Sequence, residues 1–109
     1  MPTVMTHVTY SPAGIKGVIQ EGGSKRKAAV KQMIEAAGGK LHSFYFAYGD
    51  SDVVIIAEYP DNATAASVSM AVGGAGVVSS FRSIVLITPE EMDAAAKKSV
   101  AYRPPGAKG

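Results

Sequence analysis

Four segments of the chain have the hydrophobic pattern of strands in a half-buried sheet. Residues 3–10 alternate, 41–48 are rich in aromatic side chains, and 53–59 and 77–87 are β-branched runs. Gly, Pro, Asp and Ser interrupt the chain between these segments, and residues 49–52 join the second strand to the third at hairpin length. The pattern therefore predicts four strands.

The best-supported helix is predicted between the first two strands. Apolar residues from Ala29 to Ala37 recur at helical spacing, and charged residues fall between them. Ser24 is expected as the N-cap and Gly38 as the stop. For residues 15–20 the pattern indicates only an extra turn.

Two further helices are predicted after the third and fourth strands. Asp61 is expected to cap an Ala-rich helix that runs to about Val72 and is ended by the glycines in 73–76. The segment Thr88-Pro89-Glu90-Glu91 is a capping box with Pro at the first helical position, and opens a helix to about Val100. The predicted fold is α+β, a ferredoxin-like βαββαβ sandwich with an extra C-terminal helix.

Length and composition indicate one folded domain. The chain has 109 residues, of which 47% are hydrophobic and 18% charged, so it suits a single core and is unlike a disordered segment. We expect residues 1–101 to form the domain and 102–109 a mobile tail. A domain this small buries a limited share of its surface, which favours oligomerisation.

Several classes of function have no sign in the composition. The net charge of +2 does not indicate a nucleic-acid partner, and no run approaches the roughly 20 apolar residues of a membrane span. The absence of cysteine excludes disulfides, thiolate metal sites and cysteine nucleophiles. The segment 73–76 lacks the Lys-Ser/Thr ending of a phosphate loop, and no cofactor is expected. The cytoplasm is the expected compartment.

Alternation along the third strand separates two faces. Val53, Ile55 and Ala57 share one face, which we expect under the helices. The other face is mixed and lies open, with two β-branched side chains between two carboxylates, in the order Asp52, Val54, Ile56, Glu58. This mixture predicts a face that a second subunit covers while leaving a cavity.

The chain resembles the GYD-domain proteins, small uncharacterised ferredoxin-like domains, over nearly its whole length. The stretches that carry the resemblance are Gly14-Ile15-Lys16, Gly38-Gly39-Lys40, Phe44-Tyr45, Gly49-Asp50-Ser51-Asp52-Val53-Val54, Glu58, Pro60-Asp61 and Gly74-Ala75-Gly76. One departure is Ser51, which stands where the Gly-x-Tyr-Asp pattern has Tyr. The resemblance implies a dimeric α/β barrel made by packing two sheets, without an established reaction.

Six side chains are candidates for a ligand site, each with a structural alternative: Arg82, Glu58, Tyr48, His42, Asp52 and His7. Arg82 would hold a substrate anion or pair with Glu58, its obvious structural partner. Asp52 would act as a base or a cation ligand, but hairpin chemistry alone explains an Asp in that turn. The histidines have no metal-ligand spacing, so no metal site is predicted. Lys25, Arg26, Lys27 and Lys31 are interpreted as a solvated basic helix face.

Three functions stay open from the sequence. The first is a homodimer, or a higher homo-oligomer, that binds a small anionic or aromatic molecule in a cavity on the open sheet face. The second is a cofactor-independent enzyme that uses His7, Asp52 or Glu58 for proton transfer in the same cavity. The third is a purely structural assembly module.

Overall fold

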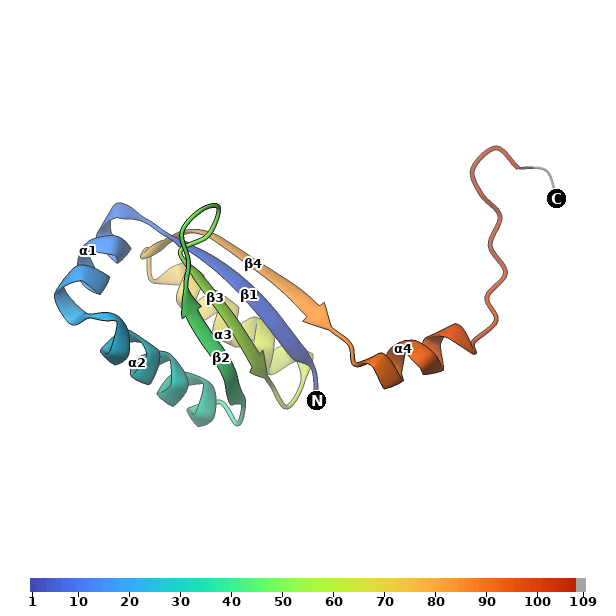
Figure 1. The fold of residues 1–109 in the computed structure, drawn as a ribbon, viewed down its shortest axis with the longest axis horizontal. Coiled ribbons are helices and arrows are strands. Elements are labelled where there is room, and N and C mark those ends of the chain that lie inside the picture. The colour runs from blue at the N-terminus through green and yellow to red at the C-terminus, as the bar shows by residue number, and fades with distance from the viewer. Residues whose placement is uncertain (108–109) are drawn as a thin grey trace.

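The computed structural model describes residues 1–107, which form a four-stranded antiparallel sheet and four helices (Figure 1). The elements in chain order are β1 (Thr3–Tyr10), α1 (Pro12–Glu21), α2 (Gly23–Ala36), β2 (Lys40–Phe46), β3 (Val53–Glu58), α3 (Asn62–Gly74), β4 (Val78–Leu86) and α4 (Pro89–Ala96). The predicted α+β class is confirmed, and the predicted strand ends agree with these bounds to within two residues. The number of helices exceeds the prediction by one.

The sheet has the strand order β2-β3-β1-β4, which suits the ferredoxin-like arrangement. The strand β1 is central, with Val8 opposite Val53 of β3 and Phe81 of β4. Directly opposed residues in antiparallel strands point to the same face, so this register fixes the face on which every side chain of the sheet lies.

Residues 12–21 form a whole helix, where the sequence indicated only an extra turn. Ser11 Oγ accepts a hydrogen bond from the Gly14 N–H at 3.2 Å, and Pro12 stands in the first turn. Proline is favourable there because its missing N–H would have no partner in the helix. Ser11-Pro12 therefore starts α1, although it was interpreted as the break after the first strand.

The other helix ends differ from the predictions in detail. The helix α2 begins at Gly23, one residue before Ser24, and its N-cap is Gly22 without a side-chain hydrogen bond, so the predicted Ser24 cap is wrong. At the other end, Gly38 follows the helix with a positive φ of 84°, as expected of a glycine stop. Asp61 caps α3 as predicted, because its carboxylate accepts from the Thr64 N–H at 2.7 Å. Hydrogen bonding by the side chain and then by the backbone of Thr64 lowers the pKa of Asp61 below its usual value. The glycines at 73 and 74 extend α3 instead of ending it.

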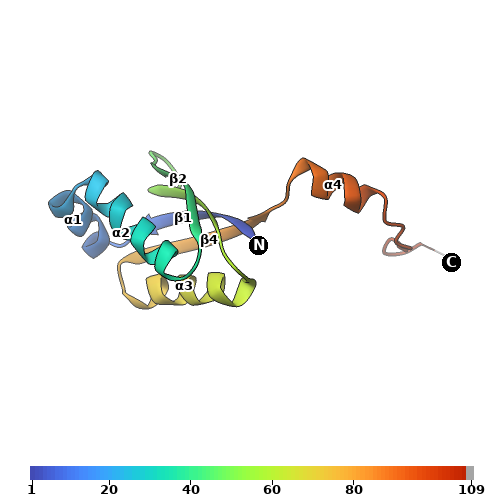
Figure 2. The same ribbon diagram turned by 90° about the horizontal axis from the view of Figure 1, so that it is seen from below.

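The helices α2 and α3 pack on one face of the sheet, and no helix of residues 1–107 covers the other face (Figures 1 and 2). Val53 and Ala57 of the predicted covered face are each 1% exposed, and they contact a core completed by Ile34 of α2 and Val68 of α3. The alternation predicted for the third strand is therefore confirmed. No helix within residues 1–107 is long and apolar enough to cross a lipid bilayer.

The last helix stands apart from the sheet. The predicted capping box is present, because Thr88 Oγ1 accepts from the Glu91 N–H and the Glu91 carboxylate accepts from the Thr88 N–H, both at 3.0 Å. The helix α4 ends at Ala96, four residues before the predicted end, and lies beyond the end of β4, away from the other helices (Figures 1 and 2). Of the predicted mobile tail, residues 108–109 lie outside the described residues.

A close backbone approach fixes α1 against the sheet. Gly14 is buried, and a Cβ at this position would collide with the backbone carbonyl oxygen of Val77. The same carbonyl accepts the Ser11 N–H at 3.0 Å, so it cannot move away without losing a hydrogen bond. Gly17, one turn further on, is exposed and has open space around it.

We expect Gly14→Ala to lower the free energy of unfolding by about 2–3 kcal/mol, the usual range for overpacking a close contact. Gly17→Ala is the matched control, and it should raise stability by about 0.5–1 kcal/mol because alanine is the better helix former. Urea unfolding followed by circular dichroism measures both. Equal effects of the two substitutions would contradict the packing assigned to Gly14.

Candidate functional site

The side of the sheet without helices, here called the open face, carries all the side chains that point away from α2 and α3. The register assigns to it Thr3, Met5, His7 and Thr9 of β1, Lys40, Ser43 and Tyr45 of β2, Val54, Ile56 and Glu58 of β3, and Ser80, Arg82, Ile84 and Leu86 of β4. Four of the six candidate residues lie on this face, counting His42, whose position is described below.

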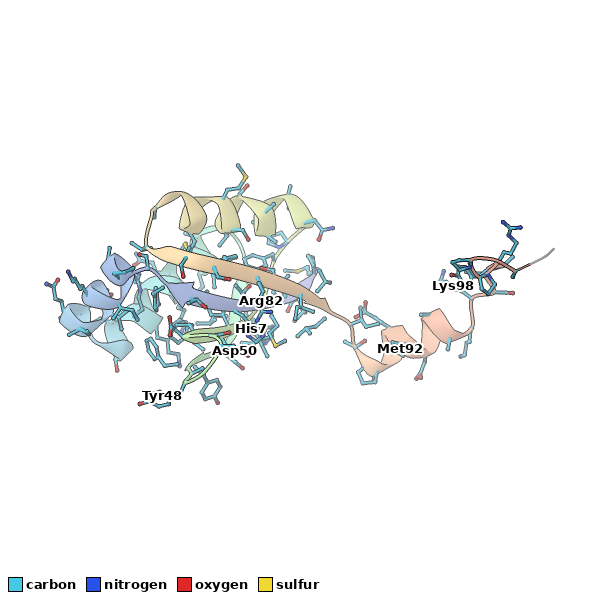
Figure 3. The ribbon with its side chains drawn as sticks, turned by 90° about the horizontal axis from the view of Figure 1, so that it is seen from above. His7, Tyr48, Asp50, Arg82, Met92 and Lys98 are labelled. Carbon is cyan, nitrogen blue, oxygen red and sulfur yellow. The ribbon has the colours of Figure 1, made fainter. Side chains whose placement is uncertain are left out.

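The first polar cluster of the open face is formed by His7, Arg82 and Ser51. His7 of β1 lies directly opposite Arg82 of β4, and Figure 3 shows the two side by side. On its other side, His7 Nδ1 lies 3.1 Å from the Oγ of Ser51, a buried residue of the β2–β3 loop. Arg82 forms no ion pair with any other group in residues 1–107. The imidazole of His7 therefore contacts the hydroxyl of Ser51 and stands opposite Arg82, whose guanidinium has no ion-pair partner in residues 1–107.

The second polar cluster is a pair made by His42 and Glu58. His42 Nε2 lies 3.1 Å from Glu58 Oε2, and both side chains are partly exposed. The register of β2 shifts between Leu41 and Ser43, so that His42 is the extra residue of a bulge. The expected pairing of Glu58 with Arg82 is wrong, because Glu58 is level with Leu86 of β4, four residues along the strand from Arg82.

An apolar row separates the two clusters. His7 is level with Val54 on β3, four residues before Glu58, so the clusters lie about 13 Å apart at roughly 3.3 Å per strand residue. Ile56, Met5 and Ile84 lie between them in one line across the sheet. The structure therefore has two small polar sites on the open face rather than one. Within residues 1–107, no three His, Asp or Glu side chains gather as a metal site would require.

Two sequence candidates lie away from both clusters. The Asp52 carboxylate accepts the backbone N–H of Tyr10 at 2.9 Å, and the Asp52 N–H donates to the Val8 carbonyl at 2.8 Å. Asp52 thus ties the β2–β3 loop to the end of β1. Tyr48 is fully exposed and projects from the same loop, away from the sheet (Figure 3).

A cavity of about 300 Å³ lies on the helix side of the sheet, between α2, α3 and the central strands. Its walls are mainly apolar, with Tyr10, Tyr59 and Arg26 as titratable groups. The sequence interpretation missed this site, since it placed Arg26 among solvated lysines. Arg26 comes three residues before Ala29 and four before Val30, so it lies on the apolar stripe of α2. This spacing is the sequence signal that could have placed Arg26 at the cavity.

The family model of the GYD domain matches residues 5–96 of the chain. The chain belongs to the GYD-domain family. The matched segment includes both polar clusters and the cavity of this GYD domain, and it ends at the last residue of α4. A comparison with curated proteins found no match.

We expect Asp52→Ala to lower the free energy of unfolding of the GYD domain by about 1–3 kcal/mol, because the Tyr10 N–H loses a charged acceptor. Asp50→Ala is the matched control: the Asp50 side chain is exposed, and its loss should change stability by no more than about 0.5 kcal/mol. Thermal and urea unfolding measure both variants. If Asp52→Ala were as stable as Asp50→Ala, the structural role of Asp52 would be refuted.

Proposed function

We propose that this GYD domain is a homodimeric binding module, in which two copies pack through their open faces and enclose a small anionic or aromatic molecule. The observation that carries the proposal is the apolar row on the uncovered face, made of Ile56, Met5 and Ile84 and continued by Val54 and Tyr45 in the neighbouring row. A second copy of the same face supplies a matching surface, as a two-fold dimer requires.

The exposure of this row supports self-association. Ile84 is 49% exposed and Tyr45 is 70% exposed in the single chain, although both lie in strands of the sheet. Burying apolar area stabilises a complex by about 25 cal/mol per Å². A continuous apolar row offers more area to bury at one contact than scattered side chains do. The polar clusters on either side of the row would then lie at the edges of the interface.

The cluster of His7 and Arg82 is the proposed ligand site on this face. A guanidinium without a carboxylate partner has all its donors available, and its planar geometry suits a carboxylate or phosphate oxygen pair. His7 lies beside it and adds a further hydrogen-bonding group. Partial burial by a second subunit would strengthen both interactions by excluding water.

A second candidate function is a cofactor-independent enzyme that moves a proton in the same place. The contact of 3.1 Å between His7 Nδ1 and Ser51 Oγ favours it, since an imidazole within hydrogen-bond reach of a hydroxyl is the arrangement of a general base. Arg82 would stabilise the negative charge that develops on the substrate. The third function, a purely structural module, is the case in which the dimer forms but binds no small molecule.

The dimer is tested by sedimentation velocity at micromolar concentrations. The wild type is expected to sediment as a dimer, and Ile84→Glu as a folded monomer, because a carboxylate would be buried in the centre of the interface. Ile19→Glu is the matched control: Ile19 is an exposed apolar residue of α1, remote from the open face, and its variant should stay dimeric. A monomeric wild type overturns the proposal.

The ligand is tested by native mass spectrometry of the purified protein. A copurified small molecule is expected in the wild type, and Arg82→Gln should lose it while remaining dimeric. If the released compound is converted by the wild type and left unchanged by His7→Gln, the protein is the enzyme of the second candidate. A ligand-free wild-type dimer, also unable to bind inorganic phosphate or benzoate, supports the structural module and refutes the binding site.

A further inference from the structure

We propose that the cavity between α2, α3 and the sheet is a binding site for a small monocarboxylate with an apolar body, whose carboxylate is held by Arg26. This site lies inside a single chain, on the side of the sheet opposite to the open face. It is therefore independent of the dimer and of the cluster around Arg82.

Short side chains on the facing sides of the two helices leave the cavity unfilled. Ala29 and Val30 of α2 line the cavity on one side, and Val72 of α3 lines it on the other, with the exposed Ala71 at its rim. Protein interiors seldom contain a void much larger than a water molecule, and ligand pockets begin at about 300 Å³. The cavity of about 300 Å³ has the size of a ligand site, and its apolar walls make it a poor site for water.

Arg26 has hydrogen-bond donors without a partner at this cavity. Its Nε is buried and makes no hydrogen bond to any group of residues 1–107. The nearest acidic partner is Glu21, whose Oε2 lies 3.6 Å from Nη1, beyond the usual length of a hydrogen bond. A buried donor without an acceptor is unfavourable, and the edge formed by Nε and a neighbouring Nη matches the two oxygens of a carboxylate. The Arg26 side chain is 34% exposed, which places it at the mouth of the cavity.

Two tyrosines add neutral donors to the same cavity. Burial raises the pKa of both Tyr10 and Tyr59 above the usual 10.0, so both hydroxyls stay protonated at neutral pH. At Tyr10 the positive charge of Arg26 acts against this rise in pKa, and the negative charges of Asp52 and Glu21 add to it. Tyr10 and Arg26 both line the cavity, so a carboxylate on Arg26 has a neutral hydroxyl donor among the lining residues.

The chemistry of the walls selects the class of ligand. The lining residues other than Arg26, Thr6 and the two tyrosines are apolar, so a sugar or nucleotide would lose its hydrogen bonds to water without replacement. One guanidinium compensates one negative charge, and it repels an amine. An acid with a single carboxylate and an aliphatic or aryl body satisfies both conditions.

Isothermal titration calorimetry at pH 7 tests the proposal with octanoate, octan-1-ol and octylamine. The folded wild type is expected to bind octanoate about tenfold or more tightly than octanol, as a charged hydrogen bond implies, and octylamine no better than octanol. Decanoate should bind more tightly than octanoate, by up to about fourfold per methylene for as long as the cavity accommodates the chain. If octanoate does not bind at millimolar concentration, or octylamine binds equally well, the proposal is wrong.

Four variants locate the site. Arg26→Gln should lose the preference for octanoate over octanol, and Ala29→Leu should weaken both ligands because the new side chain occupies the cavity. Ala28→Leu, an exposed neighbour on the same helix, is the control for Ala29→Leu and should bind as the wild type does. Lys27→Gln, which removes an exposed positive charge from the same helix outside the cavity lining, is the control for Arg26→Gln and should also leave octanoate binding unchanged.

The outcomes distinguish this site from the one on the open face. Octanoate binding that persists in the monomeric Ile84→Glu variant supports a site within one chain, whatever becomes of the proposed dimer. Binding that is lost in Arg82→Gln and kept in Arg26→Gln refutes the cavity and places the acid on the open face. Circular dichroism and thermal unfolding of each variant establish that it is folded, and Ala29→Leu is expected to melt at a higher temperature because it fills a void.

Discussion

Two helices cover only one face of the four-stranded sheet, and every other feature of this protein depends on that asymmetry (Figures 1 and 2). Because successive side chains of a strand point to opposite faces, neighbours in sequence have unlike surroundings. Thr6 lies under the helices and its Oγ1 is 3.2 Å from Ser83 Oγ, whereas His7 lies on the open face beside Arg82. The same alternation produces an enclosed side with a cavity and an exposed side with an apolar row.

The open face has an arrangement of apolar and polar side chains that exposure to water alone does not explain. Its centre is apolar, whereas its two ends carry the His7 and Arg82 cluster and the His42 and Glu58 pair. An apolar centre favours association, and polar groups at fixed positions around it favour one orientation of the partner over others. The face would thus bring both affinity and specificity to a two-fold contact.

The covered face contains groups that lower the stability of the chain. A buried Arg26 Nε without an acceptor and a cavity of about 300 Å³ are both unfavourable for folding, and a larger hydrophobic side chain at Ala29 would reduce the second defect. Natural proteins depart from good packing most often at functional sites. The combination of an unfilled cavity and a buried guanidinium N–H without an acceptor at one place is the reason for assigning a ligand to it.

The sequence by itself determined the strands, the main helices and the side of β3 that is buried, because periodicity and capping are local properties. Val53 and Ala57 were placed correctly by alternation alone, and Asp61 and Thr88 by their capping positions. The tertiary structure decided the pairings between distant segments. The strand register placed Glu58 four residues from Arg82, and a bulge placed His42 beside Glu58. The Tyr10 N–H donates to the carboxylate of Asp52, and the packing of α2 brings Arg26 to a cavity. Such partners are separated by tens of residues, and the pattern of one segment contains no information about the geometry of another.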